Sequence, residues 1–490
     1  MGIAIDESLL ENVDDPSYDV LNYAITKHAN AIKRLDMLSD YYKGKQAIME
    51  HKMANNTHSS NAKVMVNHAK YIVDMNVGFT VGNPIGYTAA KDKNIDDIVD
   101  LFNRDDIKTH DTELEKDLST YGIADELYYL KPVSNSSDGE HTELRIASIS
   151  PKNVIMVTDD TVEHNPIFAI YEQRKRNLQG QDAGYLMTVY TRNNIIEYRT
   201  QFGTQLDPTS ATKAVKPHYF GDVPVTEFKN NQECQGDFEQ VISQIDAYNT
   251  LQSDRITDKQ DFIDALLVVY GFTLEGDIKD GMINGAPGKG EDGASVEWLT
   301  KQLDETQAET LALSIENDIH KTSYVPNMND KNFMGNISGE AMKYKLFGLL
   351  NLLSVKTSYM AEGLRRRLRL VQAIMKKQGF ADDATGCKII FTPNIPVNLA
   401  DTINNIKNAD GIIPRKITYG WLPDVDSPED VEEQMNQQNA DNIKANQAAL
   451  TGDTGANIDQ PPFSTDPNNQ KGQPNDSNSR QADQNQQNQN

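Results

Sequence analysis

Three groups of residues in this chain have types and spacings that could do chemistry. The first is the pattern G-x-G-x-x-G at residues 288–293, which holds a dinucleotide pyrophosphate when a strand precedes it and a helix starts at its end. Residues 284–287, Asn-Gly-Ala-Pro, stand where that strand would be, and the local charge is acidic. The same stretch makes no phosphate-binding P-loop, because Gly290 takes the place of Ser or Thr. We therefore expect a loop here, and no cofactor.

The second group is Asp222 with Glu227 and Lys229, which have the residue types of a metal-dependent nuclease. That chemistry needs two carboxylates converging on a divalent ion beside a lysine. The nine histidines are scattered without an H-E-x-x-H motif, and Cys234 and Cys387 have no zinc-ligand spacing. We predict reduced thiols, no metal site and no enzymatic activity, and keep metal-dependent DNA processing by this group as the alternative function.

The third group is a basic cluster in a long helical pattern, made of Arg365, Arg366, Arg367 and Arg369. Arginine binds carboxylate through a planar fork, and carboxylates are abundant in this chain. We expect ion pairs with carboxylates of this chain or of a neighbouring subunit, and we assign the cluster to intersubunit pairs. A solvated face and direct contact with phosphate are the alternatives.

The overall charge limits the partners of this chain. It has 490 residues and a formal net charge of −25 at pH 7. Such a length exceeds one compact core, so several domains are expected. An acidic surface repels phosphate and anionic lipid, which argues against a tight, static DNA binder but not against a surface that DNA passes without sticking. The most apolar run, Leu346–Val355, is too short to span a bilayer, so no membrane partner is expected.

The spacing of apolar residues divides the first half of the chain into helices and strands. Residues 21–50, 62–78 and 94–120 read as helices. From Leu127 onward, short runs read as strands of one antiparallel sheet, with Asn193-Asn194 as a two-residue hairpin turn. The strands are expected at residues 127–130, 144–149, 154–157, 167–171, 186–190 and 195–198.

Two long helical stretches then flank a glycine-rich, acidic excursion at residues 272–293. The first is expected at 237–265, with the spacing of a capping box at Asp237 and a polar second half exposed to water. The second is expected at 306–322. A helical hairpin of this length cannot bury its apolar stripes in its own domain, and copies of the same chain are the simplest neighbours. The pattern therefore predicts an assembly.

A polar connector at 327–337 leads into a third long helix, expected from Ser338 to about Lys377. Apolar residues on all sides predict that its segment 346–353 is buried all round. Sixteen of the last 40 residues are Asn or Gln, and we expect no independent fold after about Leu450. Three shorter elements are expected between the third long helix and this Asn/Gln-rich tail: a strand at 388–392, a helix at 397–406 and a helix opened by Ser427-Pro428.

A series of short motifs resembles the portal proteins of tailed bacteriophages, specifically the siphophage type, over about residues 41–434. Their order and spacing carry the resemblance. The motifs are Y-Y-K-G at 41–44, N-H-A-K-Y-I-V-D at 67–74, G-N-P at 82–84, Y-G-I-A at 121–124, V-P at 223–224 with F-K-N-N at 228–231, S-G-E-A-M-K at 338–343 and F-T-P-N at 391–394.

The resemblance implies an α+β fold of the portal type. It is mainly helical, with an antiparallel sheet in the wing, long stem helices, a small clip and a C-terminal helical crown. The implied division is wing 1–236, first stem helix 237–265, clip 266–302, second stem helix 303–325, tunnel loop 326–338, wing again 339–426, crown 427–450 and a disordered Asn/Gln-rich tail 451–490.

The resemblance also implies a function. Family members form a ring, typically of twelve subunits, that conducts double-stranded DNA without sequence specificity at one capsid vertex. Genome packaging, head–tail joining and DNA ejection would involve the terminase large subunit, a head-completion or adaptor protein, and the major capsid and scaffolding proteins. The chain would assemble in the host bacterial cytoplasm and reside in the virion. The alternative becomes a metal-dependent DNA-processing enzyme of the phage head.

The resemblance also implies functional residues in two loops. The tunnel loop would face DNA, and few loop groups make weak, salt-sensitive phosphate contacts, as a conduit requires. Its candidates are Asn329, Lys331, Asn332 and Asn336. The clip would dock the terminase and the adaptor through its acidic residues Glu275, Asp277, Asp280, Glu291 and Asp292.

Overall fold

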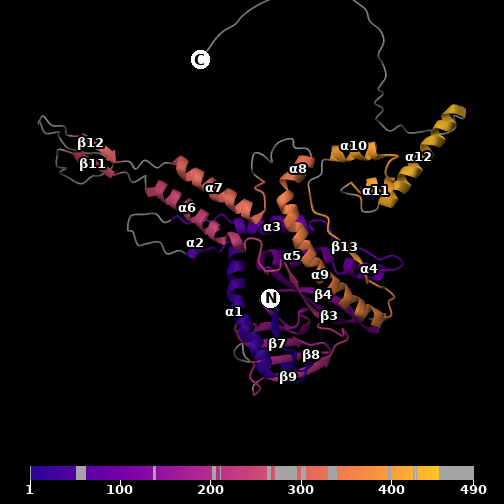
Figure 1. Ribbon diagram of the computed structural model, residues 1–490, viewed down its shortest axis with the longest axis horizontal. Coiled ribbons are helices and arrows are strands. Elements are labelled where there is room, and N and C mark those ends of the chain that lie inside the picture. The colour runs from indigo at the N-terminus through magenta and orange to yellow at the C-terminus, as the bar shows by residue number, and fades with distance from the viewer. Residues whose placement is uncertain are drawn as a thin grey trace, which may run out of the picture. The chain divides into compact units, whose positions relative to one another are not determined.

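The computed structural model describes residues 2–50, 62–135, 139–200, 206–209, 211–261, 266–270, 295–299, 305–328, 339–395, 399–422, 425 and 428–451. The chain divides into two compact units, Met1–Asn398 and Leu399–Asn490. Figure 1 labels many of the elements of both units. Helices and antiparallel sheets occur together, so the expected α+β class is confirmed.

The first unit contains two larger sheets where the sequence predicted one. Six strands lie in the order β1-β5-β6-β7-β8-β9, and three lie in the order β10-β3-β4. The six predicted strands are present as β3 to β8. Ser150 and Pro151 separate β4 from β5, and proline cannot donate to a strand ladder. The bounds are β1 Ile3–Ile5, β3 Ile123–Asn135, β4 Gly139–Ile149, β5 Val154–Asp159, β6 Pro166–Arg176, β7 Asp182–Tyr190, β8 Asn194–Thr200, β9 Thr212–Pro217 and β10 Val225–Lys229.

Two details of these sheets differ from the prediction. Strand β1 pairs with β5 in parallel, so the six-stranded sheet is mixed. The turn between β7 and β8 is not the two-residue Asn193-Asn194 turn, because Asn194 already belongs to β8 and its carbonyl accepts the N–H of Thr191 at 2.9 Å. Asp14 accepts hydrogen bonds from the backbone and the side chain of Asn193, at 3.1 and 2.8 Å, and so holds the turn in place.

Helices pack around these sheets and supply most of the core. The largest apolar cluster joins residues of α1, α3, α6, α7 and the start of α9, and it includes Leu38, Ile72 and Ile245, none of which is exposed. Short 3-10 turns occupy Glu7–Leu9 and Glu239–Val241. The helices of the first unit are α1 Tyr18–Tyr42, α2 Ala47–Glu50, α3 His68–Val81, α4 Asp96–Arg104, α5 Ile107–Tyr121, α6 Ile242–Asp261, α7 Glu305–Ser323, α8 Gly339–Lys345 and α9 Phe347–Gln378.

Helices α6 and α7 pack against each other as a pair (Figure 1). At one end Gln240 donates its side-chain amide to the carbonyl of Thr322 at 2.9 Å. Towards the other end Arg255 forms an ion pair with Glu305. Between the two helices in the chain, β11 (Leu266–Tyr270) and β12 (Ser295–Leu299) form an antiparallel ladder. The predicted helical pair is therefore present.

The start of the first stem helix differs from the prediction. Asp237 does not cap it, and α6 begins at Ile242 after a 3-10 turn. The Asp237 carboxylate is instead buried, and it accepts hydrogen bonds from Lys356 at 2.6 Å and from Asn230 at 2.8 Å. The capping-box interpretation was therefore wrong, because a buried lysine competes for the same carboxylate.

The polar second half of α6 is not simply exposed to water, as was expected. Asn249 and Ser253 have no exposed surface. Asn249 accepts the backbone N–H of Val66 at 2.8 Å, and Ser253 accepts that of Val64 at 3.0 Å. Residues four apart share one face of a helix, so these side chains line a single edge. They bind an extended segment of chain instead of water.

The third long helix is interrupted at Leu346, which separates α8 from α9. Its first residues are not buried all round, as the sequence indicated, because Phe347 is 61% exposed while Leu349 and Leu353 are buried. Ser338, the expected cap, lies outside the described residues. The expected return strand is β13 (Lys388–Ile390), which pairs with β2 (Gly86–Thr88).

The second unit, as far as it is described, consists of helices α10 (Leu399–Ala409), α11 (Arg415–Tyr419) and α12 (Pro428–Thr451). The helix expected at 397–406 is thus present from Leu399 onward. Proline stands at the first position of α12, as predicted. A proline is tolerated there because the first helical N–H has no partner within the helix.

Candidate functional site

The arginine cluster of α9 is divided between the interior and the surface. Arg367 has no exposed surface, and its guanidinium donates to Glu126 from Nε at 2.9 Å and from Nη2 at 2.7 Å. Asp111 lies 2.7 Å from the same Nη2. The hydroxyl of Tyr87 accepts a further hydrogen bond at 3.4 Å. Arg367 therefore makes its ion pairs inside the chain and is not available to a neighbouring subunit, which differs from the intersubunit role expected for it.

The two carboxyl groups around Arg367 respond differently to burial. Burial raises the pKa of Glu126, but the charge of Arg367 and the contact with His110 outweigh it and hold this pKa at about 2. Burial also raises the pKa of Asp111, and there Arg367 offsets only part of the effect. Glu126 is therefore ionised at neutral pH.

A second buried cation lies on the same face of α9. Lys356 precedes Arg367 by eleven residues, which is three helical turns. Its ammonium group lies 2.6 Å from Glu115 and 2.6 Å from Asp237, and its side chain is 3% exposed. Burial lowers the pKa of Lys356, but the two carboxylates more than compensate and raise it. Buried ion pairs thus join α9 to α5 and to the segment before α6.

The other three arginines of the cluster reach the surface to different degrees. Arg366 pairs with Asp222 at 2.9 Å and donates to the carbonyl of Val223 at 2.9 Å. Arg365 and Arg369 are exposed, and among the described residues no ion pair joins either of them. They line one hollow of about 370 Å³ together with Glu362. Of the four arginines, these two present free charge to a partner.

The residues of the alternative function, Asp222, Glu227 and Lys229, have separate environments. Asp222 is paired with Arg366, as described above. Glu227 accepts the backbone N–H of Gly2 at 3.1 Å and lies opposite Asp125 in the ladder of β10 and β3. Burial and the charge of Glu227 raise the pKa of Asp125 well above its ordinary value.

Sequence reasoning missed Asp125, because only the strand register brings it opposite Glu227. In the part of the chain that the structure describes, no group of three or more His, Cys, Asp or Glu side chains is placed to hold a metal ion. Cys234 and Cys387 are free thiols.

The loop residues expected to act lie outside the described residues. This holds for the tunnel-loop candidates Asn329, Lys331, Asn332 and Asn336, for the pattern at 288–293, and for the clip candidates Glu275, Asp277, Asp280, Glu291 and Asp292. Of residues 266–302, where the clip was expected, the structure describes the ladder of β11 and β12, which pairs Leu266 with Leu299 and Tyr270 with Ser295. The roles assigned to these loop residues remain predictions.

Helix α7 exposes apolar side chains on two flanks. Ala312 is 4% exposed and belongs to the core cluster shared with α6, whereas Leu311 and Leu313 are each 52% exposed. One residue turns a helix by about 100°, so these two leucines lie on opposite sides of the buried face. None of the described helices combines the length and apolar character needed to cross a membrane. Beside its buried face, α7 thus presents one half-exposed leucine on each flank.

Comparisons with known proteins identify the family of this chain. A family model described as phage portal protein, SPP1 Gp6-like, matches residues 21–447. The chain is also 22% identical over 403 residues to the portal protein of Bacillus phage SPP1, covering 75% of each chain. The matched residues include helices α6 and α7, strands β3 to β10, and helix α9 with its buried cations. This chain belongs to the SPP1 Gp6-like family of phage portal proteins, a family of structural proteins.

Proposed function

We propose that this chain forms a closed ring that conducts double-stranded DNA at one vertex of a phage capsid. The observation that carries the proposal is the pair of apolar flanks on α7, with Leu311 on one side and Leu313 on the other. A symmetric dimer uses one patch twice, whereas a ring uses two different patches on every subunit. Two flanks beside one buried face are what a ring subunit needs.

The charge of the chain supports a conduit for DNA. At −25 per subunit, twelve copies would carry about −300, and an acidic channel does not retain DNA. The tunnel-loop residues, with Lys331 as the cation, make the few transient phosphate contacts. The acidic clip docks the terminase large subunit during packaging and a head-completion or adaptor protein afterwards.

The remaining partners follow from this placement. The wing meets the major capsid and scaffolding proteins, and the ring serves packaging, head–tail joining and ejection without enzymatic activity of its own. Assembly takes place in the host bacterial cytoplasm, and the ring resides in the virion. Arg365 and Arg369 form ion pairs with carboxylates of the neighbouring subunit.

Ring formation is tested by negative-stain microscopy of the purified chain and of two single variants, Leu311→Glu and Leu313→Glu. The wild type is expected to form rings with a central hole. Each variant retains one intact flank and loses the other, so neither closes a ring alone. When the two variants are mixed, the intact flank of one is expected to bind the intact flank of the other. Dimers result, and no larger assembly forms. Thr310→Glu, an exposed change on the face of α7 opposite Ala312, is the matched control and leaves rings intact.

Two results would contradict the proposal. A wild type that stays monomeric or dimeric at high concentration is not a ring subunit. Rings that persist in both leucine variants would remove α7 from the interface. Packaging by the ring is then measured as protection of DNA from nuclease in phage heads, and deletion of residues 329–336 is expected to abolish it while leaving assembly intact.

A further inference from the structure

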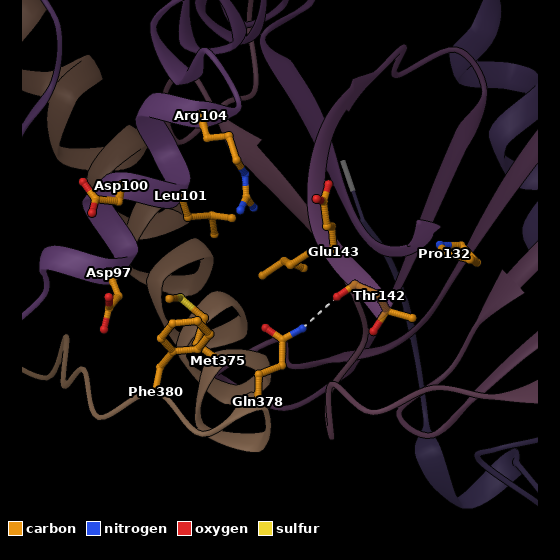
Figure 2. Close-up of a pocket in the computed structure, with 11 residues that line it drawn as sticks. Asp97, Asp100, Leu101, Arg104, Pro132, Thr142, Glu143, Met375, Gln378 and Phe380 are labelled. Carbon is orange, nitrogen blue, oxygen red and sulfur yellow. Dashed lines mark hydrogen bonds between the residues drawn. The ribbon is translucent and has the colours of Figure 1, made fainter. Parts of the chain in front are cut away.

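A large pocket lies between α4, the strands β3 and β4, and the end of α9 (Figure 2). Its volume is about 900 Å³, within the range of pockets that hold ligands. The floor is apolar, since Leu101, Leu144 and Met375 are between 2% and 6% exposed. Phe380 adds an aromatic ring that is 43% exposed. Of these four side chains, Phe380 leaves the most apolar surface uncovered by the chain.

The wall formed by α4 is acidic. Asp97 and Asp100 line the pocket, and no ion pair of the described residues joins either carboxylate. Burial raises the pKa of Asp97, and the nearby carboxylates of Asp382 and Asp100 raise it further. Like charges are thus crowded together along this wall, and a cation placed beside it would relieve their repulsion.

The other charged residues of the pocket do not supply that cation. Glu143 on the opposite wall is occupied by Arg145, whose Nη2 lies 2.6 Å away. Arg104 is the one cation among the residues that line the pocket, against the carboxylates of Asp97, Asp100 and Glu143, and its Nε lies 3.6 Å from Asp105 and not against Asp97 or Asp100. Gln378 and Thr142 are already joined, because the Gln378 amide donates to the Thr142 carbonyl at 3.1 Å, as the dashed line in Figure 2 shows.

We propose that this pocket is a docking site for a segment of a partner protein in which an apolar side chain is flanked by lysine or arginine. The apolar side chain fills the floor, and the flanking cations meet Asp97 and Asp100. Charge complementarity selects this occupant. A second copy of a chain that carries −25, or the phosphates of DNA, would add negative charge to an acidic wall. The proposal does not depend on ring closure or DNA conduction.

The occupant is identified with a library of random twelve-residue peptides displayed on their messenger RNA. Binders are selected on the immobilised full chain after removal of those that also bind the Asp97→Asn/Asp100→Asn/Phe380→Ala variant. The expected product is a family of peptides with an aromatic or aliphatic residue between lysines or arginines. An empty selection, or selected peptides without cations, overturns the proposal.

The best selected peptide is then labelled and measured by fluorescence polarisation. Asp97→Asn/Asp100→Asn is expected to weaken binding about fivefold, since each exposed ion pair contributes only modestly to binding. Phe380→Ala weakens it by a similar factor through lost apolar contact. The control Glu7→Gln/Glu11→Gln removes two exposed carboxylates elsewhere and leaves binding unchanged. Equal weakening in the control, or spermidine binding as tightly as the peptide, would show that net charge alone is responsible and would overturn the proposal.

Discussion

Replacing Arg367 by methionine is the sharpest test of how charge is used in this fold. The side chain has no exposed surface and holds Glu126 and Asp111 at 2.7 Å each. Methionine fills much of the same space but carries no charge. The variant therefore leaves two carboxyl groups buried without a cation, and removing one partner of a buried ion pair costs about 3–5 kcal/mol.

The pKa of Glu126, which Arg367 and His110 together lower, points in the same direction. The pKa of Glu126 is held at about 2, against an ordinary value of 4.5. One pKa unit corresponds to about 1.4 kcal/mol, so the surroundings favour ionised Glu126 in the folded protein by about 3 kcal/mol. The folded pKa lies below the unfolded one, so this stability is present above pH 4.5 and is lost as the pH falls towards 2. Neutral pH is therefore the correct condition for the test.

Urea unfolding at pH 7 is followed by circular dichroism, because both tryptophans, Trp298 and Trp421, lie outside the sheets that Arg367 supports. All proteins are compared at one concentration, since association shifts apparent stability. Arg367→Met is expected to lose about 3–5 kcal/mol. Arg365→Met, two residues away and exposed, is expected to change stability by less than about 0.5 kcal/mol.

A double variant separates charge from packing. Adding Glu126→Gln to Arg367→Met removes one of the uncompensated carboxylates, so it is expected to recover part of the loss. If Arg367→Met unfolds within about 0.5 kcal/mol of Arg365→Met, the buried ion pair does not stabilise this fold and the reasoning above is refuted.

Three further predictions concern other parts of the fold, each measured as the urea midpoint. Gly363→Ala places a Cβ 2.3 Å from a buried phenylalanine ring, so overpacking is expected to cost about 1–3 kcal/mol and to outweigh the helix preference for alanine. The control Gly78→Ala, whose Cβ would meet no atom within 4 Å, is expected to stabilise the protein. A shift of both urea midpoints in the same direction would contradict this. Ser253→Ala leaves the backbone N–H of Val64 without its acceptor and is expected to cost about 1–3 kcal/mol of stability. Thr250→Ala, an exposed change on the same helix, is expected to cost less. Equal losses of stability would refute the role of Ser253. Burial and a neighbouring histidine lower the pKa of His68 to about 4. Between pH 6.5 and pH 5 the histidine of the unfolded chain takes up a proton, so the wild type is expected to lose about 1–2 kcal/mol of folding stability. His68→Phe should lose less stability over this range, and an equal loss would show that another group titrates.

The sequence predicted the elements of this fold better than their partners. Hydrophobic spacing located the stem helices and the strands from β3 to β8, because each depends on neighbours in the chain. It did not separate the two sheets or reveal the parallel pairing of β1 with β5. The pairing of β1 with β5 joins residues more than a hundred positions apart, for which a single sequence carries no local signal. The two sheets separate at Ser150 and Pro151, a local break that hydrophobic spacing alone does not identify.

Polar residues were the main source of wrong predictions. Asp237 has the spacing of a helix cap, yet Lys356 binds its carboxylate at 2.6 Å. The polar run of α6 looks solvated, yet Asn249 and Ser253 are buried against an extended segment. In both cases the polar group is satisfied by a distant part of the chain, and composition alone does not distinguish such a partner from water.

Helix geometry alone could have predicted which arginines of the cluster are buried. In the sequence the four arginines form one basic block, but residues four apart share a face of a helix and residues two apart do not. Arg365 and Arg369 therefore lie together, while Arg367 lies on the face that also carries Lys356, with apolar Met360 and Leu364 between them. A cation on an apolar face is buried and needs a carboxylate from its own chain. Arg365 and Arg369 lie on the opposite face and are exposed, so their spacing alone indicates that two of the four arginines are open to a partner such as the neighbouring subunit of the proposed ring.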